Sequence, residues 1–528
     1  MSLVTDILTF LGLLEPDVAD DQGLPRVLVK IVDSIALNLD QAAVLSLGQL
    51  AAKAGPLGVG AAFEAIQSVA PDVVFGRAFD SLSPTELDAL VAAAVAQDPT
   101  YVPFNFNNAL EIVCDVGFDT AELETALSNW AGVVEYAYTG AEASDPIIAG
   151  VPNPLFRFQK YLGPAPDGID AQSAWAKGAD GTGTNIIDME QGWFLAHVDL
   201  PAGIPLLQGI NTEKSFSHGA AVLGILAAKD DTFGIVGVAP NTQIKVISYY
   251  DPNAKPKTNP VKRVEDRIAK SGDLLSLGDV LLLESQFQIY DVQKNGKVPG
   301  ATATNLPVEF EPLVFEAIRV ATSKGVIVIE AAGNGGKYLN PVTKKFEQRG
   351  TDLDTFVNKA GKKALSRATP ADFKNSGAIM VTGSVSAAPH GRHKFLNFGS
   401  RIDCYAWGED IVTCTYDPKV PTADPKAPKA RDLYWGIGIE FKTVDADPLR
   451  GFFGGTSGAS PIIAGSCLLM QHLQALLSPK GRPPGKLKCA DMQTILTKPS
   501  NGTASSAATD RIGIMPDFAK IIANEFLP

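Results

Sequence analysis

The chain of 528 residues is 45% hydrophobic, which is enough to bury a large core in two or three folded units. Its 58 acidic residues outnumber its 45 basic residues, and no basic cluster offers a face for phosphate groups, so nucleic acid is not an expected partner. The five cysteines are too few and too scattered for a disulfide scaffold, although Cys404 and Cys414 could face each other across a hairpin.

The N-terminal segment lacks the pattern of a targeting signal. The apolar stretch 7–14 is surrounded by acidic residues and the first basic residue is Arg26, whereas a secretory signal peptide begins with positive charge. No apolar run reaches the roughly 18 residues that a membrane-spanning helix needs. We therefore expect no membrane span, and a protein that is cytoplasmic, exported by a non-standard route, or stripped of a leader.

Three segments precede the main domain. Residues 1–98 predict a helical N-terminal module, with the clearest helix start at the capping sequence that begins with Ser83. Residues 99–140 alternate strand, helix and strand and predict a small α+β unit. Residues 141–170 are rich in Pro, Gly and Asp and predict an exposed linker.

Residues 171–528 alternate strand and helix, which predicts an α/β fold with a mainly parallel sheet and helices on both faces. The expected strands are 185–187, 243–249, 279–283, 325–329 and 378–382, and the expected helices are 219–228, 261–271 and 312–324. In such folds, functional side chains gather where strands end.

Four side chains in this region suggest a catalytic set. Ser457 lies among small residues before an apolar helix that is expected to begin near Pro461. Asp188 and Asn334 each follow apolar strand residues, and His218 begins a helix. A serine nucleophile needs a base, the base needs an orienting acid, and the oxyanion needs a preplaced donor. Alone, each residue has a plainer explanation as a loop serine, a capping acid, a turn amide or a core histidine; their combination and order favour catalysis.

These motifs, in this order, resemble those of the subtilisin-like serine peptidases. The matching segments are 455–461 around the serine, 218–224 at the histidine, 331–334 before the asparagine, and the loop 234–240. The resemblance spans roughly residues 171–528 and implies a serine endopeptidase acting on proteins or peptides. It implies that no cofactor or catalytic metal is required. It assigns catalysis to Asp188, His218 and Ser457, the oxyanion hole to Asn334, and substrate binding to Glu284, Ser285, Gln286 and Gly333.

The resemblance also gives a role to the preceding segments. Residues 99–140 look like an inhibitory prodomain, so the protein's own prodomain is an expected partner and 141–170 becomes a processing region. Asp230 and Asp231 could bind a structural calcium ion, although two adjacent acids are usually a solvated turn. The insertion 416–451 is expected to cover part of the cleft as a surface loop.

Three acids depart from the family pattern. Glu190 follows Asp188 closely where small residues are usual, Glu284 stands where a serine is usual, and Glu330 interrupts an apolar strand. Because the strands leading to these acids are neighbours in the family's sheet, Glu190, Glu284 and Glu330 could form a carboxyl cluster that shares a proton or binds a cation, with raised and coupled pKa values. The alternative is that each acid points to solvent or pairs with Lys or Arg.

Two other functions are compatible with these residues. A non-catalytic binding protein on the same scaffold would explain large side chains at edges that the family keeps small. A serine-carboxyl peptidase shares a similar serine motif but uses Glu in place of His, and the intact His218-Gly219 pair argues against it.

Overall fold

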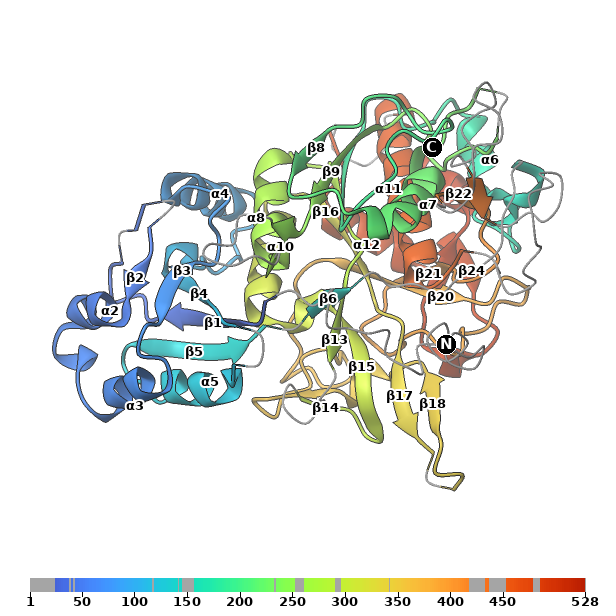
Figure 1. Ribbon diagram of the computed structural model, residues 1–528. Helices are drawn as coiled ribbons and strands as arrows, with labels where there is room; N and C mark the ends of the chain where they lie inside the picture. The colour runs from blue at the N-terminus through green and yellow to red at the C-terminus, as the bar shows by residue number, and fades with distance from the viewer. Residues whose placement is uncertain are drawn as a thin grey trace, which may run out of the picture.

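A nine-stranded sheet forms the centre of the computed structural model (Figure 1). Its strand order is β24-β25-β21-β20-β16-β12-β7-β9-β8, and all pairs are parallel except β24 with β25. The strands are β7 (Asn185–Glu190), β8 (Leu206–Gln208), β9 (Gln243–Ser248), β12 (Val280–Leu283), β16 (Ile327–Ala331), β20 (Ile379–Ser384), β21 (Cys404–Trp407), β24 (Gly502–Ala504) and β25 (Ile514–Pro516).

The structure describes residues 24–37, 39–40, 43–115, 118–140, 142–144, 156–231, 234–251, 261–289, 296–340, 342–416, 433–435, 453–477 and 485–527. Much of the predicted linker, most of the predicted insertion and the apolar stretch 7–14 lie outside these residues.

Helices cover both faces of the central sheet (Figure 1). The helices α7 (Phe216–Ala227) and α11 (Thr456–Leu477) share one core with Leu282 and Ile329, whereas α8 (Val264–Leu274) and α10 (Pro312–Ser323) share the other with Leu283. Two cores arise because successive side chains of a strand point to opposite faces. The predicted α/β fold, with its mainly parallel sheet, is thus confirmed.

The five strands and three helices predicted within 171–528 are all present, with ends that differ by up to three residues. The predicted start of the last long helix near Pro461 is wrong, because α11 already begins at Thr456 and includes this proline. Among the described helices, α11 alone is long and apolar enough to cross a membrane, but it is mostly buried and serves as the central core helix.

Cys404 and Cys414, which could have faced each other across a hairpin, do not form a disulfide. Cys404 lies in β21, whereas Cys414 lies in β22 (Thr413–Thr415), which pairs with β23 (Leu433–Trp435) and packs against α7. All five cysteines are buried as free thiols.

A second sheet, with strand order β18-β17-β15-β13-β6, flanks the central sheet. Its strands are β6 (Glu142–Ser144), β13 (Gln286–Ile289), β15 (Ala301–Pro307), β17 (Gly336–Leu339) and β18 (Phe346–Arg349). The edge strand β6 is antiparallel to β13, with Ser144 opposite Gln286. A segment from the start of the predicted linker therefore pairs with a strand of the main domain.

The N-terminal unit is built on a five-stranded antiparallel sheet of order β2-β3-β4-β1-β5. Its elements are β1 (Arg26–Ile31), β2 (Leu45–Ser46), α2 (Leu47–Ala54), α3 (Ala61–Val69), β3 (Val74–Arg77), α4 (Pro84–Gln97), β4 (Ala109–Val113), α5 (Thr120–Ser128) and β5 (Val134–Thr139). Without β2 and α4, the strand and helix order is that of the ferredoxin-like βαββαβ motif, with α2 and α3 together in the place of its first helix.

The expected boundary at residue 98 does not divide this unit, because β1 from the first segment lies between β4 and β5 from the second. The strand β1 was not predicted. Its residues Val27 and Val29 face the core of α2, α3 and α5, while Leu28 joins the core shared with α8 and α10. The helix start predicted at Ser83 is confirmed by a capping box between Ser83 and Glu86.

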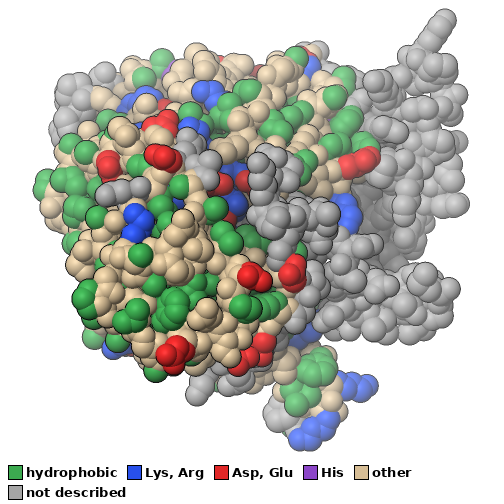
Figure 2. Space-filling model, turned by 60° about the vertical axis from the view of Figure 1, so that its left-hand side comes forward, with side chains coloured by type: hydrophobic (Ala, Val, Ile, Leu, Met, Phe, Trp, Pro, Cys, Tyr) green, Lys and Arg blue, Asp and Glu red, His purple; other side chains and the backbone are tan. Residues whose placement is uncertain are grey.

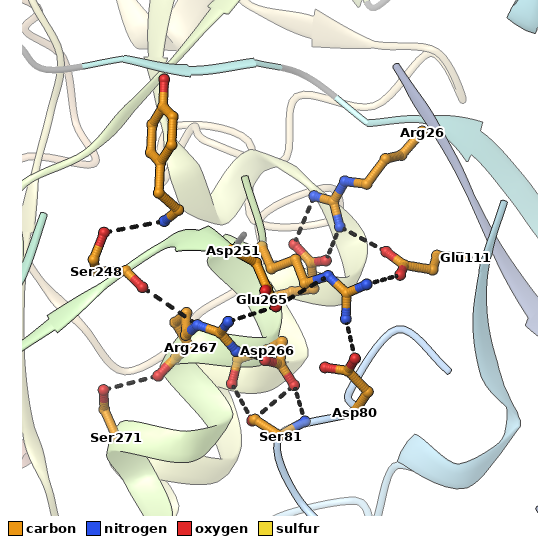
Figure 3. Close-up of polar contacts among 12 residues, drawn as sticks. Arg26, Asp80, Ser81, Glu111, Ser248, Asp251, Glu265, Asp266, Arg267 and Ser271 are labelled. Carbon is orange, nitrogen blue, oxygen red and sulfur yellow. Dashed lines mark hydrogen bonds and ion pairs between the residues drawn. The ribbon is translucent and has the colours of Figure 1, made fainter. Parts of the chain in front are cut away.

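Buried ion pairs join the N-terminal unit to α8 (Figure 3). Arg26 of β1 donates to both carboxyl oxygens of Glu265 on α8, at 2.5 and 3.2 Å, and to Glu111 of β4 at 3.1 Å. Asp266, also on α8, accepts a hydrogen bond from the backbone N–H of Ser81 at 3.0 Å. Arg263 completes the network through Glu111 at 2.6 Å. These contacts fix the N-terminal unit against the face of the sheet that α8 covers.

Replacing Arg26 by Ala should destabilise the full chain by about 3–5 kcal/mol, because Glu265 would be left buried without its cation. The control is Arg319→Ala, which breaks the half-buried pair of Arg319 with Asp98, also between the two units, and should cost about 0–1 kcal/mol. Urea unfolding of the two variants measures the difference. Equal losses would contradict a dominant role for the buried network.

Candidate active site

Ser457 is the second residue of α11 and is fully buried. Gly455, just before the helix, has φ of 76°, a left-handed backbone conformation that favours glycine. The N–H groups of a first helical turn have no partner within the helix, and the helix dipole is positive there. Negative charge that develops beside Ser457 would therefore be stabilised.

His218 is the third residue of α7, and its ring packs edge-on against Phe453 with ring centres 5.5 Å apart. The next residue must be small, because a Cβ at Gly219 would lie 2.3 Å from the carbonyl oxygen of Gly192. The nitrogen Nε2 of His218 is buried and makes no hydrogen bond within the described part of the chain. This nitrogen is thus available to accept a proton.

The other ring nitrogen of His218, Nδ1, lies 2.7 Å from a carboxyl oxygen of Glu190, the last residue of β7. Asp188 precedes Glu190 by two residues on the same strand face and accepts a hydrogen bond from the indole N–H of Trp193 at 2.6 Å. The expectation that Asp188 holds His218 is therefore corrected: the carboxyl group placed at Nδ1 belongs to Glu190.

Asn334 connects β16 to the first turn of α11. Its side-chain oxygen accepts hydrogen bonds from the backbone N–H and the hydroxyl of Thr456, both at 3.0 Å. Its amide nitrogen Nδ2 is buried and makes no hydrogen bond to any described residue. Because the oxygen is fixed on α11, the amide nitrogen is left as a preplaced donor, as an oxyanion hole requires.

The residues predicted to bind substrate lie around the start of β13. Gln286, its first residue, accepts a hydrogen bond from the backbone N–H of Asn334 at 2.8 Å, and its main chain pairs with Ser144. Ser285 is fully buried and precedes the strand. Gly333 has φ of 93°, and a Cβ there would lie 3.0 Å from the side chain of Asn397. The expected substrate edge is thus paired with a segment of the same chain.

Glu284 follows β12 and is fully buried, and the hydrogen-bonding side chain that acts on its carboxyl group is the hydroxyl of Ser457. Burial raises the pKa of Glu284 well above its usual range, against the favourable charge of His218. The carboxyl groups of Glu190 and Asp188 raise this pKa further, whereas the Ser457 hydroxyl lowers it. Two of the three acids of the hypothetical carboxyl cluster therefore lie in the same site.

Glu330 does not lie with Glu190 and Glu284, so the prediction that it joins their carboxyl cluster is wrong. It is aligned with Leu283 across the parallel strands and so points to the opposite face of the sheet from Asp188. There it accepts a hydrogen bond from the backbone N–H of Glu309 at 2.8 Å. Glu309 in turn forms an ion pair with the buried Arg401 at 2.5 Å.

No group of three or more His, Cys, Asp or Glu side chains in the described ranges is arranged to hold a metal ion. Of the two acids considered for calcium, Asp231 forms an exposed ion pair with Lys229 at 2.7 Å. The structure therefore offers no observation that favours a calcium site there.

The subtilase family model matches residues 208–510. Because this range covers more than half of the chain, the protein belongs to the subtilase family. The matched range includes His218, Asn334 and Ser457 and ends between β24 and β25 of the central sheet.

Curated relatives are distant and differ in length. The Aeromonas extracellular serine protease of Aeromonas sobria is 24% identical over 370 residues, which cover 64% of this chain and 55% of that protein. Furin-like protease 2 of Drosophila melanogaster is 26% identical over 245 residues, which cover 42% of this chain and 13% of that protein. The chain therefore spans about half of the first relative's length and much less of the second's.

A solved structure, fervidolysin from Fervidobacterium pennivorans, has the same fold, with a TM-score of 0.52 and 15% sequence identity. The similarity covers 96% of this chain and 62% of that one. A match this broad includes both the N-terminal unit and the main domain.

The contact between His218 and Glu190 predicts a low-field proton resonance for the hydrogen bond at Nδ1. Glu190→Gln should abolish this resonance, because an amide is a much weaker acceptor than a carboxylate. Asp188→Asn should retain it, since Asp188 bonds to Trp193. Proton NMR of the two variants measures the difference, and loss of the signal in Asp188→Asn alone would restore Asp188 as the partner.

Proposed function

We propose that this protein is a serine endopeptidase, made as a precursor that cleaves itself, with Ser457 as its nucleophile. Membership of the subtilase family supports a peptidase acting on proteins or peptides. One observation carries the assignment of the site: the amide nitrogen of Asn334 is buried without a hydrogen bond while its oxygen is fixed on the first turn of α11. A purely structural asparagine in a buried position would normally have both ends satisfied.

In the proposed reaction, the hydroxyl oxygen of Ser457 attacks the peptide carbonyl carbon and its proton moves to Nε2 of His218. The carboxylate of Glu190 accepts the Nδ1–H bond, which fixes the tautomer of His218 and stabilises the imidazolium. The oxyanion receives hydrogen bonds from Nδ2 of Asn334 and from the backbone N–H of Ser457.

The tetrahedral intermediate then breaks its C–N bond. His218 gives the proton to the leaving amine, and the acyl group stays on Ser457 as an ester. Water attacks the ester with His218 again as base, which releases the carboxylic acid and restores the serine. No cofactor is required for any of these steps.

A fluorophosphonate probe should label wild-type protein and should not label Ser457→Ala. Glu190→Gln should slow labelling by a factor on the order of 10⁴, because the imidazole loses the carboxylate that orients it. Asn334→Ala should slow it by about 10² to 10³, through loss of one oxyanion donor. Asp188→Asn is the matched control for Glu190→Gln and should have a much smaller effect. Absence of labelling in processed wild-type protein would instead favour a non-catalytic binding protein.

The self-cleavage proposal is supported by the position of β6. This strand continues from the N-terminal unit and pairs with β13 so that Ser144 lies opposite Gln286, whose side chain contacts Asn334. A substrate strand would add to the same edge through main-chain hydrogen bonds. The strand β6 thus runs toward the proposed oxyanion site, with Ser144 as its nearest residue.

Mass spectrometry should therefore find a new N-terminus after Ser144 and before Phe156, within the predicted processing region. Ser457→Ala should accumulate as the uncleaved chain, because the cleavage is performed by the protein itself. The same cut in Ser457→Ala would show that another peptidase makes it. An active wild-type enzyme with residues 24–144 still covalently attached would contradict the proposed precursor.

A further inference from the structure

Glu284 and Asp188 are the acids in the site that the proposed reaction does not use, and of the two Asp188 is held by Trp193. Glu284 is fully buried, and the hydrogen-bonding side chain that acts on its carboxyl group is the hydroxyl of Ser457. The groups that act on it come from two directions: Asp188 and Glu190 from β7, and His218 and Ser457 from the N-terminal ends of α7 and α11. Its carboxyl group is therefore near enough to interact with both the nucleophile and the base.

We propose that Glu284 is a positioning residue that works in its protonated form, donating its O–H to the oxygen of Ser457 and so directing the Ser457 hydroxyl toward His218. In its ionised form, the Glu284 carboxylate would instead accept a hydrogen bond from the Ser457 hydroxyl. That hydrogen bond would point the hydroxyl away from His218. This inference rests on the proposed peptidase function, because it concerns the same serine.

Asp188, Glu190 and Glu284 lie close together, and their hydrogen-bond partners indicate which of the three carboxyl groups is protonated. Asp188 accepts a hydrogen bond from the indole N–H of Trp193, and Glu190 lies against Nδ1 of His218. The hydrogen-bonding side chain that acts on Glu284 is the hydroxyl of Ser457, which is itself the proposed nucleophile, and a buried carboxylate with so little compensation is strongly disfavoured. Of the three acids, Glu284 is therefore the one that is protonated. This agrees with its pKa, which burial raises.

A protonated Glu284 leaves the steps of the proposed reaction unchanged. The hydroxyl proton of Ser457 passes to Nε2 of His218 and then to the leaving amine, while the proton on Glu284 stays on Glu284 throughout. Glu284 therefore neither gains nor loses a proton in a turnover. At alkaline pH, Glu284 loses this proton to solvent. The Ser457 hydroxyl then turns from His218 to the Glu284 carboxylate, and the site becomes inactive.

One variant of Glu284 and one control variant separate the effect of the Glu284 charge from the effect of its hydrogen bond. Glu284→Gln keeps the shape and offers an N–H donor at every pH, so it imitates the protonated acid. Glu330→Gln is the matched control, because Glu330 is also a fully buried acid on a neighbouring strand, with a pKa raised by burial, but points to the opposite face of the sheet.

The experiment measures the rate of fluorophosphonate labelling of Ser457 in the full chain and in its processed form, from neutral to alkaline pH. Wild type and Glu330→Gln should lose about tenfold in rate per pH unit above the pKa of Glu284, as expected for loss of one essential proton. Glu284→Gln should keep a flat rate over the same range. Its melting temperature should also fall less with rising pH than that of wild type, because a raised carboxyl pKa makes the folded state less stable as pH increases.

An alkaline decline that is the same in wild type and Glu284→Gln would overturn the inference while leaving the proposed peptidase intact. Failure of the probe to label wild type at any pH would overturn both. If Glu284→Gln does not fold, Glu284→Ser takes its place: it also removes the ionisable group, and an alkaline decline equal to that of wild type would again overturn the inference.

Discussion

Burial of carboxyl groups at the ends of two neighbouring parallel strands constrains the whole site. Asp188, Glu190 and Glu284 are all fully buried on the side of the sheet that α7 and α11 cover. A buried carboxyl group needs a donor, a cation or a proton. Trp193, which follows β7, donates a hydrogen bond to Asp188, and His218 of α7 contacts Glu190. The burial of these acids therefore depends on where α7 lies and on which residue follows β7.

The same constraint acts at the contact between the N-terminal unit and the main domain. Glu265 and Asp266 of α8 are fully buried, and their partners Arg26 and Ser81 come from the N-terminal unit. Because these contacts do not involve the segment between the units, cutting that segment would leave them in place. The pairing of β6 with β13 adds a second attachment beside the proposed oxyanion site.

The sequence predicted the parts of the fold that have long periodic patterns or distinctive motifs. The strands and helices around Ser457, His218 and Asn334 were identified because apolar runs end at these residues. The strand β1 was missed because six residues among helix-forming neighbours carry little periodic signal, and its burial depends on α8 and α10, which lie far away in the chain. The second sheet was missed because its strands other than β15 are short and two of its partners, β6 and β13, are distant in sequence.

The choice between Asp188 and Glu190 shows where a motif misleads. Both acids point to the same face of β7, so strand periodicity allowed either, and the resemblance favoured an aspartate by its residue type. Position along the strand was the better signal, because Glu190 is nearer the carboxyl end, where α7 begins. Glu330 and Glu284 point to opposite faces of the sheet. The sequence alone could not show this, because it depends on the register between β12 and β16.

The central claim is that Ser457, His218, Glu190 and Asn334 form one catalytic site. A crystal structure of the phosphonylated protein tests it most directly, because the phosphoryl oxygen marks the position of the oxyanion. We expect phosphorus bonded to Ser457, its oxygen within about 3.1 Å of Nδ2 of Asn334, and Nδ1 of His218 still bonded to Glu190. A phosphoryl oxygen that does not contact Asn334, or an imidazole held by Asp188 instead, would contradict the claim.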